Sequence, residues 1–117
     1  MVALRSFHHA ARLDDGRVLV VGGERSPDPS AELYDPATDT WATVAGASRH
    51  GVFLSLTKLA DGRIVAAGGT DLTTDVRSRA IDLFDPKTGV FTAQAPFAVG
   101  RAGHSATLLR DGRVLFV

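Results

Sequence analysis

Short apolar stretches, each bounded by turn residues, recur along the whole chain. They are rich in β-branched and aromatic residues, and Gly, Pro and Asp separate them, which is typical of β-strands. No stretch sustains the 3.6-residue period of an amphipathic helix. The pattern predicts an all-β chain with strands at about 8–13, 17–22, 31–35, 40–44, 52–59, 63–68, 80–85, 90–94, 103–109 and 113–117.

The strand pattern belongs to an internal repeat. Residues 13–20, 59–66 and 109–116 are near copies of one another, and each holds an Asp-Gly pair between two apolar runs. The pairs begin at positions 15, 61 and 111, in steps of 46 and 50 residues, a period typical of repeat architectures. Asp-Gly favours a tight hairpin, because Gly tolerates positive φ and Asp bonds its own backbone. We therefore expect each unit to open with a β-hairpin.

Further landmarks keep the same order in the first two units. A double glycine, an aromatic-Asp-Pro segment and a large aromatic residue follow one another: Gly22-Gly23, Tyr34-Asp35-Pro36 and Trp41, then Gly68-Gly69, Phe84-Asp85-Pro86 and Phe91. We expect the double glycines to end the second strand where the backbone approaches a neighbour or takes positive φ. The difference in length between the units falls in one connection, residues 24–30 in the first and 70–79 in the second.

These landmarks resemble the kelch motif, in which a double glycine, a variable connection, an aromatic-Asp-Pro segment and a Trp follow a pair of strands. The resemblance covers nearly the whole chain, although the second unit has Phe84 and Phe91 where the first has Tyr and Trp. It implies a β-propeller of four-stranded antiparallel blades around a central channel. The expected fold is an incomplete kelch-type propeller of about two and a half blades, over residues 5–46, 47–97 and 98–117.

A closed propeller has roughly four to eight blades. At about 50 residues per kelch unit, the 117 residues of this chain are too few to close one. Blades bury their faces against their neighbours, so a partial propeller leaves apolar faces and a strand edge open to water. We therefore expect either missing blades in a longer protein or self-association of several copies.

The composition argues against several partners. Thirteen basic and thirteen acidic residues cancel, so no net field draws the chain to nucleic acid or to an anionic membrane. The N-terminal residues show no signal-peptide pattern, and no segment has the roughly 18 apolar residues needed to span a bilayer. The chain is expected to be soluble, in a compartment that the sequence leaves open. The absence of Cys removes disulfides, thiolate metal sites and Cys nucleophiles.

No catalytic set, cofactor or metal site is predicted. His8 and His104 occupy matching positions, but Leu54 fills that place in the second unit, which indicates packing rather than metal ligation. No helix is expected after the double glycines, so they are not phosphate loops. Copper-radical sugar oxidases resemble kelch propellers, yet their Tyr–Cys cross-link has no counterpart in a chain without Cys. An oxidase whose catalytic residues lie outside this chain is the enzymatic alternative.

A non-catalytic binding scaffold is the leading interpretation. In an up-and-down blade, the connection between strands two and three and the connection to the next blade emerge on one face. Residues 24–30 and 70–79 lie there and vary while the rest of the unit repeats, which suits recognition of a protein, peptide or saccharide. The candidate contacts in the longer connection are Asp71, Asp75, Arg77 and Arg79. The alternative is an insertion that is merely solvated.

Three arginines stand at the starts of the units, on the same face. Arg5, Arg49 and Arg101 lie ten or twelve residues before an Asp-Gly pair. A ring of guanidinium groups could clamp an anion or a carboxylate. The structural alternative, which we favour, pairs each arginine with an adjacent blade or with a backbone carbonyl.

Overall fold

The first two repeat units each form one four-stranded antiparallel sheet. The computed structural model describes residues 4–24, 31–48 and 50–117. In the first sheet, the strands pair in the order β1 (His9–Arg12), β2 (Val18–Val21), β3 (Ala31–Asp35) and β4 (Thr40–Thr43). In the second, the order is β5 (Ser55–Lys58), β6 (Ile64–Ala67), β9 (Ile81–Asp85) and β10 (Val90–Ala93). The third unit contributes the pair β11 (Ala106–Leu108) and β12 (Val114–Phe116).

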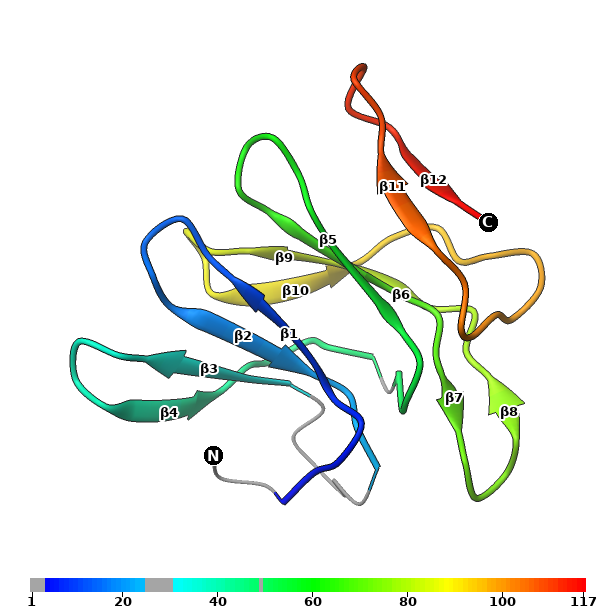
Figure 1. Ribbon diagram of the computed structural model, residues 1–117, viewed down its shortest axis with the longest axis horizontal. Coiled ribbons are helices and arrows are strands. Elements are labelled where there is room, and N and C mark those ends of the chain that lie inside the picture. Colours follow the sequence, from blue (N-terminus) through cyan, green and yellow to red (C-terminus); the bar gives the residue numbers. More distant parts are fainter. Residues whose placement is uncertain (1–3, 25–30, 49) are drawn as a thin grey trace.

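The sheets are arranged as the blades of a β-propeller. β1 packs beside β5 and β5 beside β11, so the first strands of the three units are neighbours (Figure 1). The strand order places β4 and β10 at the edges of their sheets opposite to these first strands. Within the described residues there is no helix. The predicted fold class, an all-β incomplete propeller, is therefore confirmed.

The Asp-Gly pairs form the same tight turn in each unit. The N–H of Gly16 donates to the carbonyl oxygen of Leu13 at 3.1 Å, and the Asp15 carboxylate accepts from the backbone N–H of Arg17 at 3.0 Å. Gly16 has a φ of 92°, which side chains disfavour. Asp61 with Arg63 and Asp111 with Arg113 repeat the carboxylate contact. The predicted hairpins are therefore confirmed.

The double glycines hold each blade against the next. Gly22 has a φ of 72°, and a Cβ atom there would lie 2.3 Å from the carbonyl oxygen of Gly51. The N–H of Gly23 donates to that same oxygen at 2.7 Å. The second pair repeats this arrangement with the carbonyl oxygen of Arg101. A Cβ atom at Gly68 would lie 2.4 Å from that oxygen, and the N–H of Gly69 donates to it at 2.8 Å. Both predicted reasons for glycine, positive φ and close approach, are confirmed.

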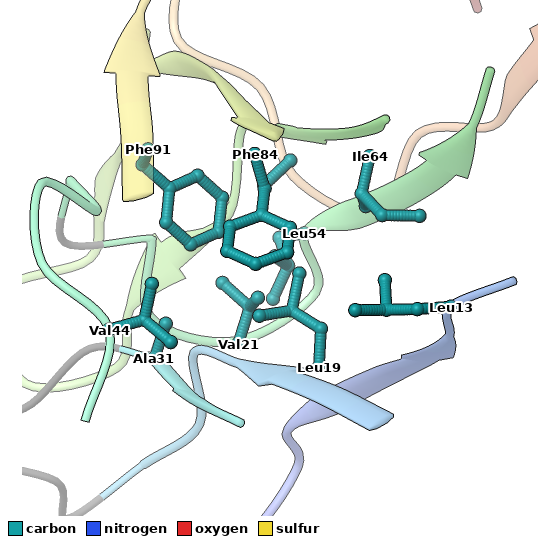
Figure 2. Close-up of a cluster of buried hydrophobic side chains, with 10 residues drawn as sticks. Leu13, Leu19, Val21, Ala31, Val44, Leu54, Ile64, Phe84 and Phe91 are labelled. Atoms are coloured by element: carbon teal, nitrogen blue, oxygen red, sulfur yellow. The ribbon is translucent and has the colours of Figure 1, made fainter. Parts of the chain in front are cut away.

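The main core lies between the first and second sheets. Its buried side chains, drawn in Figure 2, are Leu13, Leu19, Val21, Ala31, Val44, Leu54, Ile64, Ala66, Phe84 and Phe91. Phe84 and Phe91 point from the second sheet towards the first and are 0% and 5% exposed. The matching pair in the first sheet, Tyr34 and Trp41, is only partly buried, because no sheet among the described residues covers that side.

Candidate partner-binding face

The connection at residues 70–79 is a small β-hairpin, which the strand pattern does not predict. β7 (Thr70–Asp71) pairs with β8 (Val76–Arg77). The Asp71 carboxylate accepts from the backbone N–H of Thr73 at 2.8 Å. Asp75 ends the turn with a φ of 54°, and its N–H donates to the carbonyl oxygen of Asp71 at 2.7 Å. The two strands are too short and too polar to show an alternating pattern in the sequence.

Two backbone segments hold the base of this hairpin. Val52 and Thr70 exchange N–H···O bonds of 2.9 Å and 2.8 Å. On the other side, the N–H of Ser78 donates to the carbonyl oxygen of Gly69 at 2.7 Å. The carbonyl oxygen of Ser78 accepts from the N–H of Arg101 at 3.1 Å. The hairpin therefore projects from a fixed base, at the opposite end of the molecule from the Asp-Gly turns (Figure 1). We call this end the hairpin face, and it comprises residues 4–8, 50–54, 70–79 and 97–104.

An open cleft of about 500 Å³ lies beside the hairpin. It is lined by His50, Gly51, Asp71, Thr74, Val76, Arg77, Ser78 and Arg79. Three of the four predicted contacts in this connection, Asp71, Arg77 and Arg79, thus line one cleft, and Asp75 is exposed in the hairpin turn. Arg79 also donates through Nε to the carbonyl oxygen of Phe97 at 2.7 Å. The cleft therefore presents acidic and basic groups together.

Arg5 and Arg101, two of the three arginines at the unit starts, contact residues of their own region. The Arg5 side chain is fully buried, and it donates to the Gly22 carbonyl oxygen at 2.7 Å and to the Glu32 carboxylate at 2.8 Å. The Arg101 guanidinium lies over the Phe97 ring, 4.4 Å from its centroid. The Arg5 side chain therefore stabilises the first sheet through hydrogen bonds to Gly22 and Glu32. The ring of arginines stays a prediction.

Two predicted parts of this face lie outside the described residues. They are Arg49 and, from the connection at 24–30, residues 25–30. Glu24 is described, and its backbone exchanges N–H···O bonds of 2.7 Å and 3.3 Å with Ser6. The first connection therefore leaves β2 alongside the segment that leads into β1.

In the second unit, a buried network takes the place of the Arg5–Glu32 pair. His50 has Nδ1 2.8 Å from the carbonyl oxygen of Gly68 and Nε2 3.0 Å from the Asp82 carboxylate. Ser48 donates to the same carboxylate through its backbone N–H at 2.6 Å and its hydroxyl at 3.0 Å. The side chains of His50 and Asp82 are 0% exposed. Sequence reasoning missed this network.

A signal for the network was present in the repeat. Glu32 and Asp82 both stand immediately before the matching Leu-aromatic-Asp-Pro run, inside an apolar strand. An acidic side chain at a buried strand position needs donors or a cation beside it. Searching for the partner of each carboxylate would have led to the start of the unit, and so to Arg5 and His50.

The network keeps Asp82 ionised. Burial is the largest single influence and raises the pKa of this carboxyl, but hydrogen bonds from His50 and Ser48 together outweigh it, so the pKa lies below its ordinary value. The two groups facing His50, a carbonyl oxygen and a carboxylate, are both acceptors. The arrangement links a buried carboxylate to the start of the unit, as the Arg5–Glu32 pair does in the first unit.

Ser48, His50 and Asp82 are the residue types of a hydrolase triad, but they are arranged differently. A triad needs the Ser hydroxyl bonded to one His nitrogen while the Asp holds the other. Here the Ser48 hydroxyl bonds to Asp82, and the second nitrogen of His50 faces a backbone carbonyl. Buried His50 and Asp82 are also out of reach of a substrate. The network therefore links the start of the unit to β9 and has no catalytic geometry.

The matching residues His8 and His104 lie in different surroundings. His8 is exposed, whereas His104 is bonded through Nε2 to the Ser55 hydroxyl at 2.9 Å and packs edge-on to Phe97 and Phe116. Burial, and then the charge of Arg101, lower the pKa of His104. In the part of the chain that the structure describes, no three His, Cys, Asp or Glu side chains gather as a possible metal site. The same residues include no helix that is long and apolar enough to cross a membrane.

The blades and their contacts define a class of protein, the β-propellers. The Kelch motif matches residues 5–47. Kelch-like protein 36 of Rattus norvegicus is 28% identical over 114 residues, covering 92% of this chain and 18% of that protein. Kelch-like protein 36 of Bos taurus is 30% identical over 104 residues, covering 88% and 17%. Beta-scruin of Limulus polyphemus is 32% identical over 110 residues, covering 86% and 12%.

A solved structure of YjhT has the same fold. It superposes with a TM-score of 0.67 over 87% of this chain and 40% of that chain, at 16% sequence identity. At this identity the likeness shows the fold alone, whereas the motif and the relatives show that this chain belongs to the kelch-repeat family. The chain spans less than a fifth of the length of the curated relatives that it matches.

Proposed function

We propose that this chain is a segment of a non-catalytic kelch propeller that binds a protein, peptide or saccharide on the hairpin face, through residues 70–79, together with the connection at residues 24–30. The hairpin of residues 70–79 carries this proposal. β8 is exposed on both residues and adds nothing to the main core, yet backbone bonds fix the base of the hairpin on both sides. An exposed insertion on a rigid base suits recognition.

The chemistry of the cleft supports a partner that carries a carboxylate. Arg77 and Arg79 line it, and guanidinium groups pair with carboxylates in a fork geometry. Exposed Leu72 and Val76, at 46% and 64%, add apolar contact area on the same hairpin. A partner segment that combines an acidic and an apolar side chain is therefore expected to bind better than a neutral polar one.

The described residues also support the non-catalytic part of the proposal. The one Ser-His-Asp set among them is the buried network, which a substrate does not reach. The hairpin cleft contains His50 in its lining, but both ring nitrogens of His50 are already engaged by Gly68 and Asp82. His50 therefore has no free ring nitrogen towards the cleft, which offers charged and apolar contacts for binding.

The test compares two exposed arginines on opposite faces. Binders are selected from a displayed library of random peptides and, in parallel, from an array of saccharides, and are then titrated against each variant. Arg77→Gln is expected to weaken binding by about tenfold, because one charge-assisted hydrogen bond contributes roughly 1.5–3 kcal/mol. Arg110→Gln, at the third Asp-Gly turn, is the matched control and leaves binding unchanged. Equal affinity of every binder for the parent and for Arg77→Gln would contradict the proposal.

A further inference from the structure

Three matching positions share an unusual backbone conformation. Phe7, Phe53 and Gly103 each stand eight residues before the aspartate of an Asp-Gly pair. Their φ angles are 55°, 58° and 64°, in the left-handed region. The repeat therefore requires a left-handed residue just before the first strand of every unit.

Glycine meets this requirement without strain, and the third unit uses it. A bulky side chain in the left-handed region is strongly disfavoured. The other non-glycine residues with positive φ in the described ranges are Asp39 and Asp75, short polar turn residues that tolerate this conformation. Phe7 and Phe53 are thus unfavourable choices at positions where the same chain shows a favourable one. Their rings must serve something other than the backbone.

Burial does not offset this strain. Phe7 is 62% exposed and Phe53 is 47% exposed. The two rings contact each other, with centroids 6.4 Å apart and planes tilted by 42°, as in other aromatic pairs. Phe53 directly follows Val52, which is bonded to the base of the hairpin. The pair therefore forms an exposed aromatic row on the hairpin face, and Leu4, 88% exposed, precedes it in the chain.

The aromatic row leads into open space at the third unit. The N–H of Gly103 donates to the carbonyl oxygen of Phe53 at 2.9 Å, so the two segments lie side by side. No atom lies within 4 Å of the point where a Cβ of Gly103 would stand. The third position of the row thus has the backbone of the first two and lacks their ring. The surface beside Phe53 is therefore open at the third position.

We propose that this space receives one ring-sized apolar side chain of a partner protein or peptide, which packs against Phe53 where a third phenylalanine would stand. The inference rests on the proposed function of this face and adds the chemistry of the partner. The exposed rings are apolar, and the Gly103 N–H is already bonded, so a saccharide would lack the directed polar contacts that such ligands use. Buried aromatic anchors commonly dominate the affinity of protein interfaces.

The experiment uses the whole chain and peptides selected from a displayed library of random sequences. Selected peptides are expected to share an aromatic or leucine side chain. Phe53→Gly should weaken their binding by about tenfold or more, while the melting temperature stays at or above that of the parent, because glycine relieves the strain. Gly103→Phe should fill the space and abolish binding. Val90→Thr, at an exposed apolar residue of β10, is the matched control and should change neither quantity.

The Arg77 and Phe53 variants together separate this inference from the proposed function. Peptides that need Arg77 but bind Phe53→Gly as well as the parent would overturn this inference and leave the proposed function standing. Peptides that need Phe53 but not Arg77 would support the inference and contradict the role of the hairpin cleft. Peptides that bind Gly103→Phe unchanged, or strong binding of saccharides that depends on Phe53, would overturn the inference. A library that yields no binder would contradict both.

Discussion

Asp82→Ala is predicted to destabilise the second blade severely. The Asp82 side chain is 0% exposed in β9 and accepts from Ser48 at 2.6 Å and 3.0 Å, with the ring of His50 at 3.0 Å. Removing the carboxylate leaves the imidazole and the Ser48 N–H without their acceptor inside the protein. The substitution also cuts the link between β9 and the start of the unit.

The size of the loss follows from these contacts. Hydrogen bonds to a charged group each contribute roughly 1.5–3 kcal/mol, and the cost of burying the charge offsets part of their sum. A buried donor that is left without its acceptor costs about 1–3 kcal/mol, and Asp82→Ala leaves such donors at Ser48. A small domain has a total free energy of unfolding of about 5–15 kcal/mol. Asp82→Ala should therefore lose a large part of the stability of this chain.

Urea unfolding followed by circular dichroism measures this loss. The matched control is Asp61→Ala, because Asp61 also accepts hydrogen bonds from a nearby residue, Arg63, but its side chain is 53% exposed. Water screens an exposed pair, so Asp61→Ala is expected to lose much less stability than Asp82→Ala. A loss below about 1 kcal/mol for Asp82→Ala would refute the buried network.

The same network fixes the direction of a pH effect. The pKa of Asp82 is lower in the folded chain than its ordinary value, so its contribution to stability is fully present above the unfolded pKa of about 3.9. That contribution is lost as the pH falls through the lower, folded pKa. Below about pH 4, the parent should lose more stability per pH unit than Asp82→Ala does. Equal slopes in urea unfolding would contradict the assignment.

Three further predictions concern the blades and the enzymatic alternative. Gly68→Ala should lower the free energy of unfolding in urea far more than Gly89→Ala does. A Cβ at Gly68 would lie 2.4 Å from a carbonyl oxygen, whereas a Cβ at Gly89, also at positive φ, would have no atom within 4 Å. Similar losses for the two variants would refute the close approach. Sedimentation velocity should show self-association that grows with protein concentration, because β12 has an open edge among the described strands and Leu115 is 48% exposed. A monomer at every concentration would contradict this prediction. Copper titration should show no stoichiometric binding, and one ion bound per chain would favour the oxidase alternative.

The blades were predictable because their signals are local. Each signal, such as an Asp-Gly turn, a double glycine or an alternating apolar run, determines structure within a few residues. Because the signals repeat, each unit supports the prediction made for the others. The hairpin of β7 and β8 was not predictable in this way. Each of its strands has two residues, and its base is held by backbone bonds to Val52 and Arg101, which are distant in the sequence.

The candidate site was predictable only in part. The variable connection and its charged residues could be found from the repeat. Matching Arg5 to Arg49 by residue type, however, did not predict that His50 contacts Asp82, the counterpart of Glu32. That contact depends on a partner in another strand. The positive φ of Phe7 and Phe53 was harder to predict, because the one sequence signal for it is the glycine at the matching position of the third unit, Gly103.

Amide chemical-shift mapping locates the partner most directly. A peptide selected against the parent chain is added to the ¹⁵N-labelled protein, and the shift of every backbone amide is followed. The largest changes are expected at Val52, Thr70, Arg77 and Gly103, which together outline the hairpin face. Changes confined to the Asp-Gly turns at positions 15, 61 and 111, at the opposite end of the molecule, would contradict binding at this face.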